Sequence, residues 1–151
     1  MNDLYSKPGH LIRRVQQVAS ALFADECAEF DLTSVQYAAL FAIGANPGVD
    51  ATRLSALIAF DRSTIGDVLE RLETKRLIVR SPSPSDRRVK LLHLSPEGLQ
   101  VLQGVRPAVD RVQERLLAPL APADRATLVR LLAQLVDRHG DGPPVALHAA
   151  E

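Results

Sequence analysis

The stretch "SPSDRRVKLLHLSPEG", residues 83–98, contains the side chains best suited by type and spacing to bind an anion. Asp86, Arg87 and Arg88 follow one another in a segment rich in proline and serine. Guanidinium groups make paired, charge-assisted hydrogen bonds with phosphates and carboxylates. A neighbouring carboxylate can hold a guanidinium in one rotamer, which reduces the entropy lost on binding. A second interpretation, in which both arginines are ordinary solvated loop residues, stays open at this point.

Charge is distributed unevenly along the 151 residues, although the net charge is zero. Residues 52–95 hold nine basic and five acidic side chains, whereas residues 1–51 hold three and six, and residues 96–151 six and seven. A basic middle between acidic flanks indicates that only the middle of the chain meets a polyanion. Scattered surface charge is the alternative, and the elements predicted for this segment have to decide.

The elements that position these residues are predicted from helical periodicity and capping residues. Helices are expected over residues 8–29, 51–59, 62–76, 96–118 and 122–139. A further helix is expected to begin at the capping box Thr33–Gln36 and to end at "NPG", residues 46–48. Two short apolar runs on either side of "PSPSD" predict a β-hairpin. Two helices joined by a tight turn and followed by a hairpin are typical of a winged helix-turn-helix. We therefore expect a mainly α fold with a small β-hairpin wing.

The helix predicted over residues 62–76 carries polar side chains opposite its apolar stripe. A recognition helix needs short polar groups where it enters the major groove of DNA, and basic groups at its edges that meet phosphates. The candidates for reading bases are Ser63, Thr64 and Asp67, and those for contacting phosphates are Arg53, Arg62 and Arg71. Gly66 is costly in a helix interior, and close approach of another surface would explain it. A merely solvated face is the alternative, against which the adjoining wing argues.

Residues 61–98, "DRSTIGDVLERLETKRLIVRSPSPSDRRVKLLHLSPEG", resemble the core signature of the MarR family of bacterial regulators. Three motifs carry the resemblance: Leu72-Glu73 through Leu77, Asp86 through Arg88, and Leu94-Ser95 through Gly98. Arg76 departs from the family pattern, which usually has a turn glycine there, and this puts the exit of the preceding helix in doubt. The order of predicted helices matches the family over residues 8–139.

This resemblance implies a homodimer that binds double-stranded DNA at a pseudo-palindromic operator, as a repressor. It divides a single domain, residues 1–151, into a helical dimerisation region (8–30 and 96–139), a winged helix-turn-helix lobe (31–95) and a loose tail (140–151). The aliphatic outer helices agree with dimerisation. By the same resemblance Arg88 enters a minor groove, Asp86 orients it, and Arg87 lies near the DNA backbone.

Polar residues in the first predicted helix suggest a ligand site. His10, Arg14 and Gln17 are spaced i, i+4 and i+7, and Arg13 is a further candidate. Tyr37 and Phe41 share one face of the second helix, which the family packs against the first. An aromatic cleft with cationic groups at its mouth suits an aromatic carboxylate such as a hydroxybenzoate, and the first helix resembles that of family members that answer to aromatic acids. A solvated face or a salt bridge between subunits is the alternative.

Other classes of function find little support in the sequence. The four histidines lack metal-ligand spacing, and no nucleophile–base arrangement is present, so neither an enzyme nor a cofactor is predicted. The single cysteine, Cys27, is interpreted as structural because the neighbouring carboxylates and the end of the helix disfavour a thiolate. The absence of a long apolar run or a signal peptide predicts a cytoplasmic protein. Two alternatives stay open: a winged helix that binds protein in place of DNA, and a MarR-type regulator that answers to a redox or other effector and not to an aromatic ligand.

Overall fold

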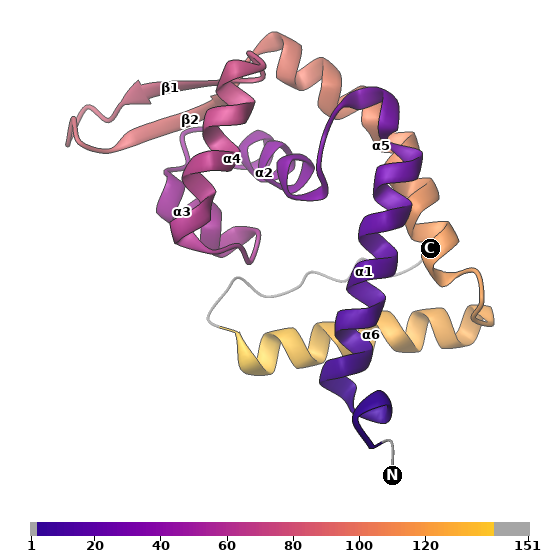
Figure 1. The fold of residues 1–151 in the computed structure, drawn as a ribbon. Coiled ribbons are helices and arrows are strands. Elements are labelled where there is room, and N and C mark those ends of the chain that lie inside the picture. Colours follow the sequence, from indigo (N-terminus) through magenta and orange to yellow (C-terminus); the bar gives the residue numbers. More distant parts are fainter. Residues whose placement is uncertain (1–2, 141–151) are drawn as a thin grey trace.

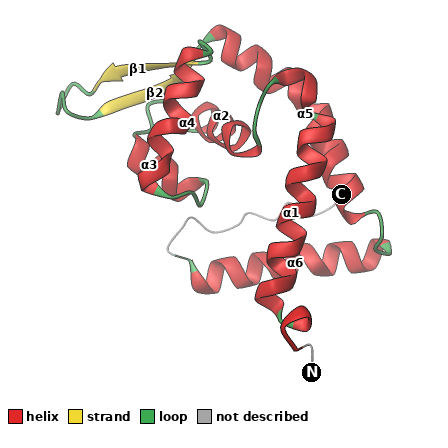
Figure 2. Ribbon diagram, viewed as in Figure 1, coloured by secondary structure: helices red, strands yellow, loops and turns green. Residues whose placement is uncertain are grey.

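The computed structural model describes residues 3–140, in which a lobe of short helices bears a hairpin and a helical arm stands beside it (Figure 1). The helices are α1 (Pro8–Glu26), α2 (Ser34–Ala45), α3 (Ala51–Leu57), α4 (Arg62–Thr74), α5 (Pro96–Leu117) and α6 (Pro122–His139). Strands β1 (Ile78–Pro82) and β2 (Lys90–Leu94) form the hairpin, and two 3-10 helices span Asp3–Ser6 and Ala28–Phe30. Helices dominate the described residues, and the hairpin is their only sheet (Figure 2). The predicted fold class is therefore confirmed, whereas residues 141–151 of the expected tail lie outside the described residues.

Capping side chains determine where the helices of the lobe begin. Thr33 Oγ1 accepts a hydrogen bond from the N–H of Gln36 and Gln36 Oε1 accepts one from the N–H of Thr33, both at 3.2 Å, which is the predicted capping box. Asp50 caps α3 as well, since its Oδ1 accepts the N–H three residues later at 2.9 Å. Asp61 precedes α4, but its side chain makes no capping hydrogen bond among the residues described. Its carbonyl oxygen instead accepts a hydrogen bond from the hydroxyl of Thr64 at 3.1 Å.

Three helices end earlier than predicted: α1 gives way to the 3-10 helix Ala28–Phe30, and a residue with a left-handed backbone follows α3 and α4. Asp31 (φ 50°) follows the 3-10 turn after α1, and Ala59 (φ 53°) follows α3. Beyond α4, Arg76 has φ 61°, and its N–H donates to the carbonyl of Glu73 at 2.9 Å. The N–H of the next residue, Leu77, donates to the carbonyl of Leu72 at 3.0 Å. These two bonds form a Schellman motif, so α4 has an ordinary exit in which Arg76 adopts the conformation that glycine usually takes.

The wing is an antiparallel pair in which Ile78 lies opposite Leu94. A bridge joins its base to the connection between α2 and α3, because the N–H of Leu92 donates to the carbonyl of Val49 at 2.9 Å. Gly48, with φ 85°, donates its N–H to the carbonyl of Leu92 at 2.9 Å. The wing is therefore attached to the lobe by backbone hydrogen bonds at its base.

The motif that runs from Ser95 to Gly98 locks the start of α5 against the wing. Ser95 Oγ accepts the N–H of Gly98 at 2.9 Å and donates to the carbonyl of Arg76 at 2.6 Å. The N–H of Ser95 donates to the carbonyl of Leu77 at 3.0 Å. A Cβ atom at Gly98 would lie 2.0 Å from that carbonyl oxygen, so only glycine permits this approach.

Two groups of buried side chains form the core. The larger lies inside the lobe, and its largest fully buried side chains are Leu40, Ile43, Leu54, Leu69, Leu72 and Leu92. The smaller lies between α1 and α5 and comprises Phe23, Cys27, Val105, Ala108, Val109 and Val112. The end of α1 and the middle of α5 therefore hold the arm together next to the lobe.

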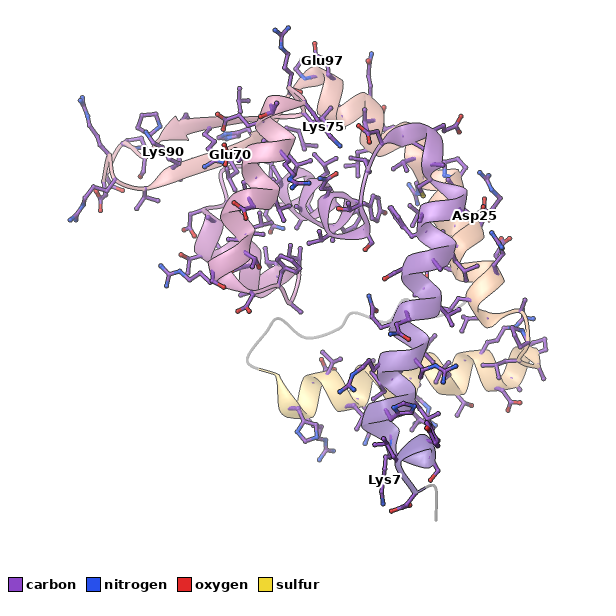
Figure 3. All side chains as sticks on the ribbon, in the orientation of Figure 1. Lys7, Asp25, Glu70, Lys75, Lys90 and Glu97 are labelled. Atoms are coloured by element: carbon purple, nitrogen blue, oxygen red, sulfur yellow. The ribbon has the colours of Figure 1, made fainter. Side chains whose placement is uncertain are left out.

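Ion pairs reinforce the contact between α1 and α5. Arg111 Nε lies 2.9 Å from Glu26 Oε2, and Arg115 Nη1 lies 3.1 Å from Glu26 Oε1 and 2.5 Å from Asp25 Oδ2. Figure 3 shows Asp25 on α1, the helix that runs alongside α5. The hydrogen bond from Arg111 is the main reason why the pKa of Glu26 is lowered, while burial acts in the opposite direction. These pairs orient α5, although partly exposed ion pairs contribute little stability.

The remainder of the arm leaves apolar side chains exposed. On α1 these are Leu11, Ile12, Val15 and Val18, and on α6 they are Val129, Leu131, Leu132, Leu135 and Val136, each 41–55% exposed. Within the described chain, α6 buries Ala133 alone. Monomeric proteins rarely expose apolar patches of this kind, so the arm has the surface that the expected second copy would cover. None of the helices in residues 3–140 is long and apolar enough to cross a membrane.

Candidate nucleic-acid interface

Helix α4 lies at the outside of the lobe, next to the hairpin (Figure 1). Its buried face consists of Ile65, Val68, Leu69 and Leu72. The predicted base and phosphate contacts on α4 are all exposed: Arg62, Ser63, Thr64, Asp67 and Arg71. The exposed face also forms one wall of a cavity of about 850 Å³, whose opposite wall is the start of α2 and the end of α1. The structure therefore places these side chains where a large ligand can reach them.

Two details of α4 bear on which groups are free to bind. The hydroxyl hydrogen of Thr64 is used in the bond to Asp61, so Thr64 can offer an acceptor but not a donor. Ser63 makes no side-chain hydrogen bond within residues 3–140 and keeps both capacities. A Cβ atom at Gly66 would meet nothing within 4 Å. No contact inside the chain explains this glycine, and the approach of another surface stays a prediction.

The tip of the wing is a turn that holds both arginines at its centre. The N–H of Val89 donates to the carbonyl of Asp86 at 3.0 Å. Asp86 Oδ1 accepts from the backbone N–H of Arg88 and from its Nε, both at 3.1 Å, and Oδ2 accepts from Nη2 at 3.2 Å. The side chain of Arg88 is 91% exposed and that of Asp86 is 40% exposed. Arg87 is exposed in the same turn.

This geometry explains why a carboxylate, Asp86, precedes two arginines at the tip of the wing. The side-chain hydrogen bond from Arg88 is the largest influence that lowers the pKa of Asp86, followed by the backbone bond from the same residue. The ionised carboxylate fixes the guanidinium through Nε and Nη2. A guanidinium has five N–H donors, so three remain for a partner. Arg88 is thus presented in a defined orientation at the exposed tip of the hairpin.

Two contacts that the sequence reasoning missed fix α4 relative to its neighbours. Arg80 Nε, on the wing, lies 2.6 Å from Glu73 Oε2 near the end of α4. Lys75, which follows α4, donates to the carbonyl oxygen of Asp31 and, at 3.2 Å, to Oε1 of Gln36. Figure 3 shows Lys75 beside the chain that connects α1 to α2. The partners of Lys75 are 39 and 44 residues away in sequence, so no local pattern could have indicated them.

Further cations lie on the same lobe. Arg53, the predicted phosphate contact on α3, is exposed. Lys90 is exposed at the start of β2 on the wing (Figure 3), and the sequence reasoning did not include it. The basic middle of the sequence is therefore arranged over α3, α4 and the wing, which agrees with a single face for a polyanion.

The structure separates the predicted ligand residues into two groups within one chain. The first group lies in the first half of α1: His10, Arg13, Arg14 and Gln17. Tyr37 lies on α2, and its contact on α1 is Phe23, with ring centroids 6.0 Å apart. Between His10 and Phe23 the helix advances roughly 20 Å, at about 1.5 Å per residue. The single cleft predicted from the sequence is therefore not formed within one chain, because that reasoning placed the wrong end of α1 against α2.

The surroundings of the first group are partly closed. The ring of His10 packs edge-on against Tyr5, with centroids 5.4 Å apart and an interplanar angle of 75°. Its Nε2 atom is shielded from solvent and has no hydrogen-bond partner among residues 3–140. Arg13, Arg14 and Gln17 are exposed.

Tyr37 and Phe41 do form an aromatic cleft, with different partners from those expected. Their ring centroids are 6.3 Å apart, and they line two cavities of about 470 and 400 Å³. The polar side chains of the smaller cavity come from α5 and are Gln103, Arg106 and Asp110. Burial is the main reason why the pKa of Tyr37 is raised, with Asp110 adding to the effect and Arg106 opposing it. The spacing of Arg106 and Asp110, i and i+4 on α5, was the signal that could have indicated them.

Cys27 is buried, with 1% of its surface exposed, as a structural role requires. The pKa of its thiol is raised mainly by burial and next by Glu26, whereas the sequence reasoning attributed the effect to charges alone. Burial and a raised pKa both lower the reactivity of a thiol. No cluster of three or more His, Cys, Asp or Glu side chains in the described part of the chain is placed to hold a metal ion.

Comparisons with known proteins agree with this arrangement. The model of the MarR family matches residues 30–89, which include α2, α3, α4, β1 and the tip of the wing. The putative transcriptional regulatory protein for the hcr operon of Thauera aromatica is 38% identical over 136 residues, which are 89% of this chain and 82% of that protein. The chain belongs to the MarR family. It is therefore a transcriptional regulator of the MarR type.

Solved structures of MarR-type regulators share the fold. PcaV from Streptomyces coelicolor, in complex with its natural ligand, is 37% identical in sequence, with a TM-score of 0.83. The match covers 91% of this chain and 96% of the PcaV chain. BpsR from Bordetella bronchiseptica is 29% identical, with a TM-score of 0.83, and the match covers 88% of this chain and 95% of the BpsR chain. The DNA binding of BpsR is regulated by 6-hydroxynicotinic acid. The winged helix-turn-helix arrangement of this MarR-type regulator is thus that of its relatives over nearly the whole chain.

Proposed function

We propose that this MarR-type regulator is a homodimeric repressor that binds a pseudo-palindromic operator in the cytoplasm and is released from it by a small aromatic acid. DNA binding is proposed chiefly because Asp86 orients Arg88 at the tip of the wing. This arginine belongs to the hairpin that adjoins α4, whose polar face is exposed. A winged helix-turn-helix places its recognition helix in the major groove. The wing then lies over the neighbouring minor groove, whose negative potential attracts arginine.

The proposed contacts on DNA divide according to side-chain chemistry. Ser63 and Asp67 near the start of α4 read base edges, with Thr64 as an acceptor. Arg53, Arg62, Arg71 and Arg87 contact phosphates, which supply affinity but carry no sequence information. The ties from Arg80 to Glu73 and from Lys75 to Gln36 keep α4 at a fixed angle to the wing and to α2. A rigid lobe loses less entropy when it binds.

Dimerisation is proposed through the dimerisation region formed by residues 8–30 and 96–139. Exposed apolar side chains on α1 and α6 provide a self-complementary surface of the kind that twofold dimers bury. Two lobes related by a twofold axis match a pseudo-palindrome whose half-sites lie about one helical turn apart, or a multiple of it. The arm therefore sets the spacing of the two recognition helices.

An aromatic acid is proposed as the effector because the aromatic cleft lies where the lobe meets the arm. Tyr37 and Phe41 belong to α2 of the lobe, while the polar wall belongs to α5 of the arm. A ligand that binds one relative position of lobe and arm better than another shifts the population towards it. Two relatives, PcaV and BpsR, are described with a natural ligand and with 6-hydroxynicotinic acid. His10, Arg13, Arg14 and Gln17 would reach this cleft only if a second copy supplied them.

The test uses the full-length protein and fluorescently labelled duplexes from the region upstream of its own gene, measured by fluorescence anisotropy. We expect tight binding to one duplex, at least about 10³-fold stronger than to a shuffled control, with affinity falling linearly as the logarithm of salt rises. Hydroxybenzoates at millimolar concentration should release the protein. Binding without dependence on sequence or salt would instead favour a winged helix that binds protein, and release by no aromatic acid would remove the effector from the proposal while leaving the repressor.

A further inference from the structure

A row of four exposed side chains runs along α4 opposite its buried face. Ser63, Asp67, Glu70 and Thr74 are spaced i, i+4, i+7 and i+11, so that each lies above the one before it on the helix surface. We call these four residues the α4 row. It contains two carboxylates and two hydroxyl groups, and no cationic or amide side chain. The centre of the exposed face is therefore acidic, although the lobe as a whole is basic.

The hydroxyl groups of this face have few protons to donate to a partner. Thr74 Oγ1 donates to the carbonyl oxygen of Glu70 at 2.9 Å. Thr64, beside the row, likewise uses its proton on the carbonyl of Asp61. A hydroxyl group carries a single O–H, so Ser63 is the one member of the row with a free donor. The α4 row therefore offers acceptors almost exclusively.

The two carboxylates of the row are free to accept hydrogen bonds from a partner. Neither Asp67 nor Glu70 (Figure 3) makes an ion pair or a side-chain hydrogen bond within residues 3–140. Glu73 differs from them, because it lies to the side of the row and is paired with Arg80 of the wing. The acids that α4 uses to hold its neighbours are thus separate from the acids that it leaves open.

The arginines of α4 lie on either side of the row. At about 100° per residue, Arg62 falls on one flank and Arg71 on the other. Phosphates line both edges of a DNA groove, whereas the base edges form its floor. The cations of α4 are therefore placed for the edges, and its carboxylates are placed for the floor.

We propose that Asp67 and Glu70 select cytosine on the DNA strand that they face, so that each half-site of the operator carries cytosine at two neighbouring positions. In the major groove cytosine presents the N4 amino donor, whereas guanine presents only the acceptors N7 and O6. A carboxylate accepts a hydrogen bond from the first base and is repelled by the second. Adenine offers an amino donor at N6, but its N7 acceptor faces the other carboxylate oxygen. The inference rests on the proposed entry of α4 into the major groove and adds the base chemistry that α4 reads.

The spacing of the two carboxylates assigns them to different base pairs. Asp67 and Glu70 are separated by about 4.5 Å along the axis of α4, at about 1.5 Å per residue. Successive bases on a strand are about 3.4 Å apart along the DNA axis. One carboxylate therefore reaches one base pair and the other reaches its neighbour. In a twofold dimer the second half-site repeats this pair of cytosines on the opposite strand.

The same carboxylates reject other sequences. Their charge repels the phosphates of any duplex, and only sites with the matching amino groups offset that repulsion. Specificity therefore arises partly from an unfavourable contact with the wrong bases. An amide of the same shape removes the repulsion and changes the base that is read, because asparagine and glutamine form paired hydrogen bonds with N6 and N7 of adenine. A change of preference from cytosine to adenine at one position is an effect that a structural defect would not produce.

The experiment selects duplexes from a randomised library with the full-length protein and compares the base preferences of the wild type, Asp67→Asn and Glu70→Gln. For the wild type we expect a C·G pair at two neighbouring positions of each half-site. Inverting either pair to G·C should cost about tenfold in affinity, measured by fluorescence anisotropy. Asp67→Asn should prefer adenine at one of the two positions, and Glu70→Gln should prefer adenine at the other. Both variants should also bind a shuffled duplex about threefold more tightly at low salt.

The matched control is Glu97→Gln. Glu97 is exposed in the first turn of α5, so this variant removes the same charge from the protein outside α4. It should keep the base preferences of the wild type. Melting temperatures check that all the variants are folded.

The outcomes separate this inference from the proposed function. If the wild-type protein selected no common sequence, the proposed operator binding would be wrong. If it selected a sequence and Asp67→Asn or Glu70→Gln kept the wild-type base preferences, operator binding would stand and the reading role of that residue would be overturned. Wild-type selection of A·T pairs at the positions that these variants alter would overturn the assignment to cytosine.

Discussion

Lys75, at the end of α4, donates a hydrogen bond to Oε1 of Gln36 in the first turn of α2, with the two atoms 3.2 Å apart. Gln36 is 4% exposed and is held by the capping box with Thr33. The same ammonium group contacts Asp31, whose left-handed backbone ends the 3-10 helix that follows α1. One cation therefore ties the recognition helix to the start of α2 and to the link with the arm.

Substitution of Lys75 by methionine should reveal a positioning role. We expect about 1 kcal/mol less stability, from the loss of hydrogen bonds to a charged group that is partly exposed, and a several-fold loss of operator affinity. Because Lys75 is occupied within the protein, the slope of log affinity against log salt should stay unchanged. A slope smaller by about one phosphate would show that Lys75 contacts DNA directly. Lys7→Met, at the far end of α1, is the control.

Two substitutions at the tip of the wing separate the effect of the charge of Arg88 on operator binding from the effect of its orientation. Arg88→Ala should weaken operator binding by about 1–3 kcal/mol and reduce the salt slope by about one phosphate. Asp86→Ala should cost less and leave the slope unchanged, since it removes the group that orients Arg88 and no cation. Anisotropy titrations at several salt concentrations measure both quantities. Wild-type behaviour of both variants from low to moderate salt would contradict the role given to the wing.

The pH dependence of the wing follows from the lowered pKa of Asp86. A carboxylate with a depressed pKa stabilises its contact while it is ionised, and the contact is lost only as pH falls through that depressed pKa. The bond between Asp86 and Arg88 should therefore persist unchanged across the neutral range. We expect the affinity ratio of wild-type protein to Asp86→Ala to be constant between pH 6 and pH 8, as measured on the same duplex.

Much of the fold was predictable because its signals are local. The capping box at Thr33 and the motif from Ser95 to Gly98 each act within four residues, and both appear as expected. The position of the aromatic cleft relative to the polar residues of α1 was not predictable, because the angle and register of α1 against α2 depend on the packing of Phe23 and Cys27 against α5. No short-range pattern encodes that packing. The pairing of Lys75 with Gln36 escaped prediction for the same reason.

Arg76 provides a test of how much strain the end of α4 contains. An L-residue in the left-handed conformation costs about 1–2 kcal/mol, and replacing Arg76 with glycine removes this cost. Part of the resulting gain in stability is offset because glycine has greater freedom in the unfolded chain. Arg76→Gly should therefore stabilise the protein by about 0.5–1 kcal/mol, seen as a melting temperature higher by about 2–4 °C. Arg76→Ala keeps the strain and serves as the control. A glycine variant no more stable than the alanine variant would contradict the account.

The exposed apolar side chains of the arm predict that the protein is a dimer. The full-length protein should have twice the chain mass of 16.4 kDa by light scattering. Leu132→Glu places a charge in the exposed apolar face of α6 and should yield monomers, because burying an unpaired charge is costly. Gln134→Glu adds the same charge to the same helix outside that face and should leave the dimer intact. A dimer that tolerated both substitutions equally would place the interface elsewhere.

Gly66 should show a conflict between stability and function. It is exposed in the middle of α4, where glycine costs about 1 kcal/mol relative to alanine, and a Cβ atom there would meet nothing within 4 Å. Gly66→Ala should therefore raise the melting temperature by about 2–4 °C. If α4 enters the major groove with this face towards the bases, the added methyl group should at the same time weaken operator binding by about tenfold, a loss of about 1.4 kcal/mol. Gly9→Ala is the matched control, because its Cβ is equally unobstructed but lies on α1, outside the lobe. Unchanged operator affinity in Gly66→Ala would mean that this face of α4 does not approach DNA closely.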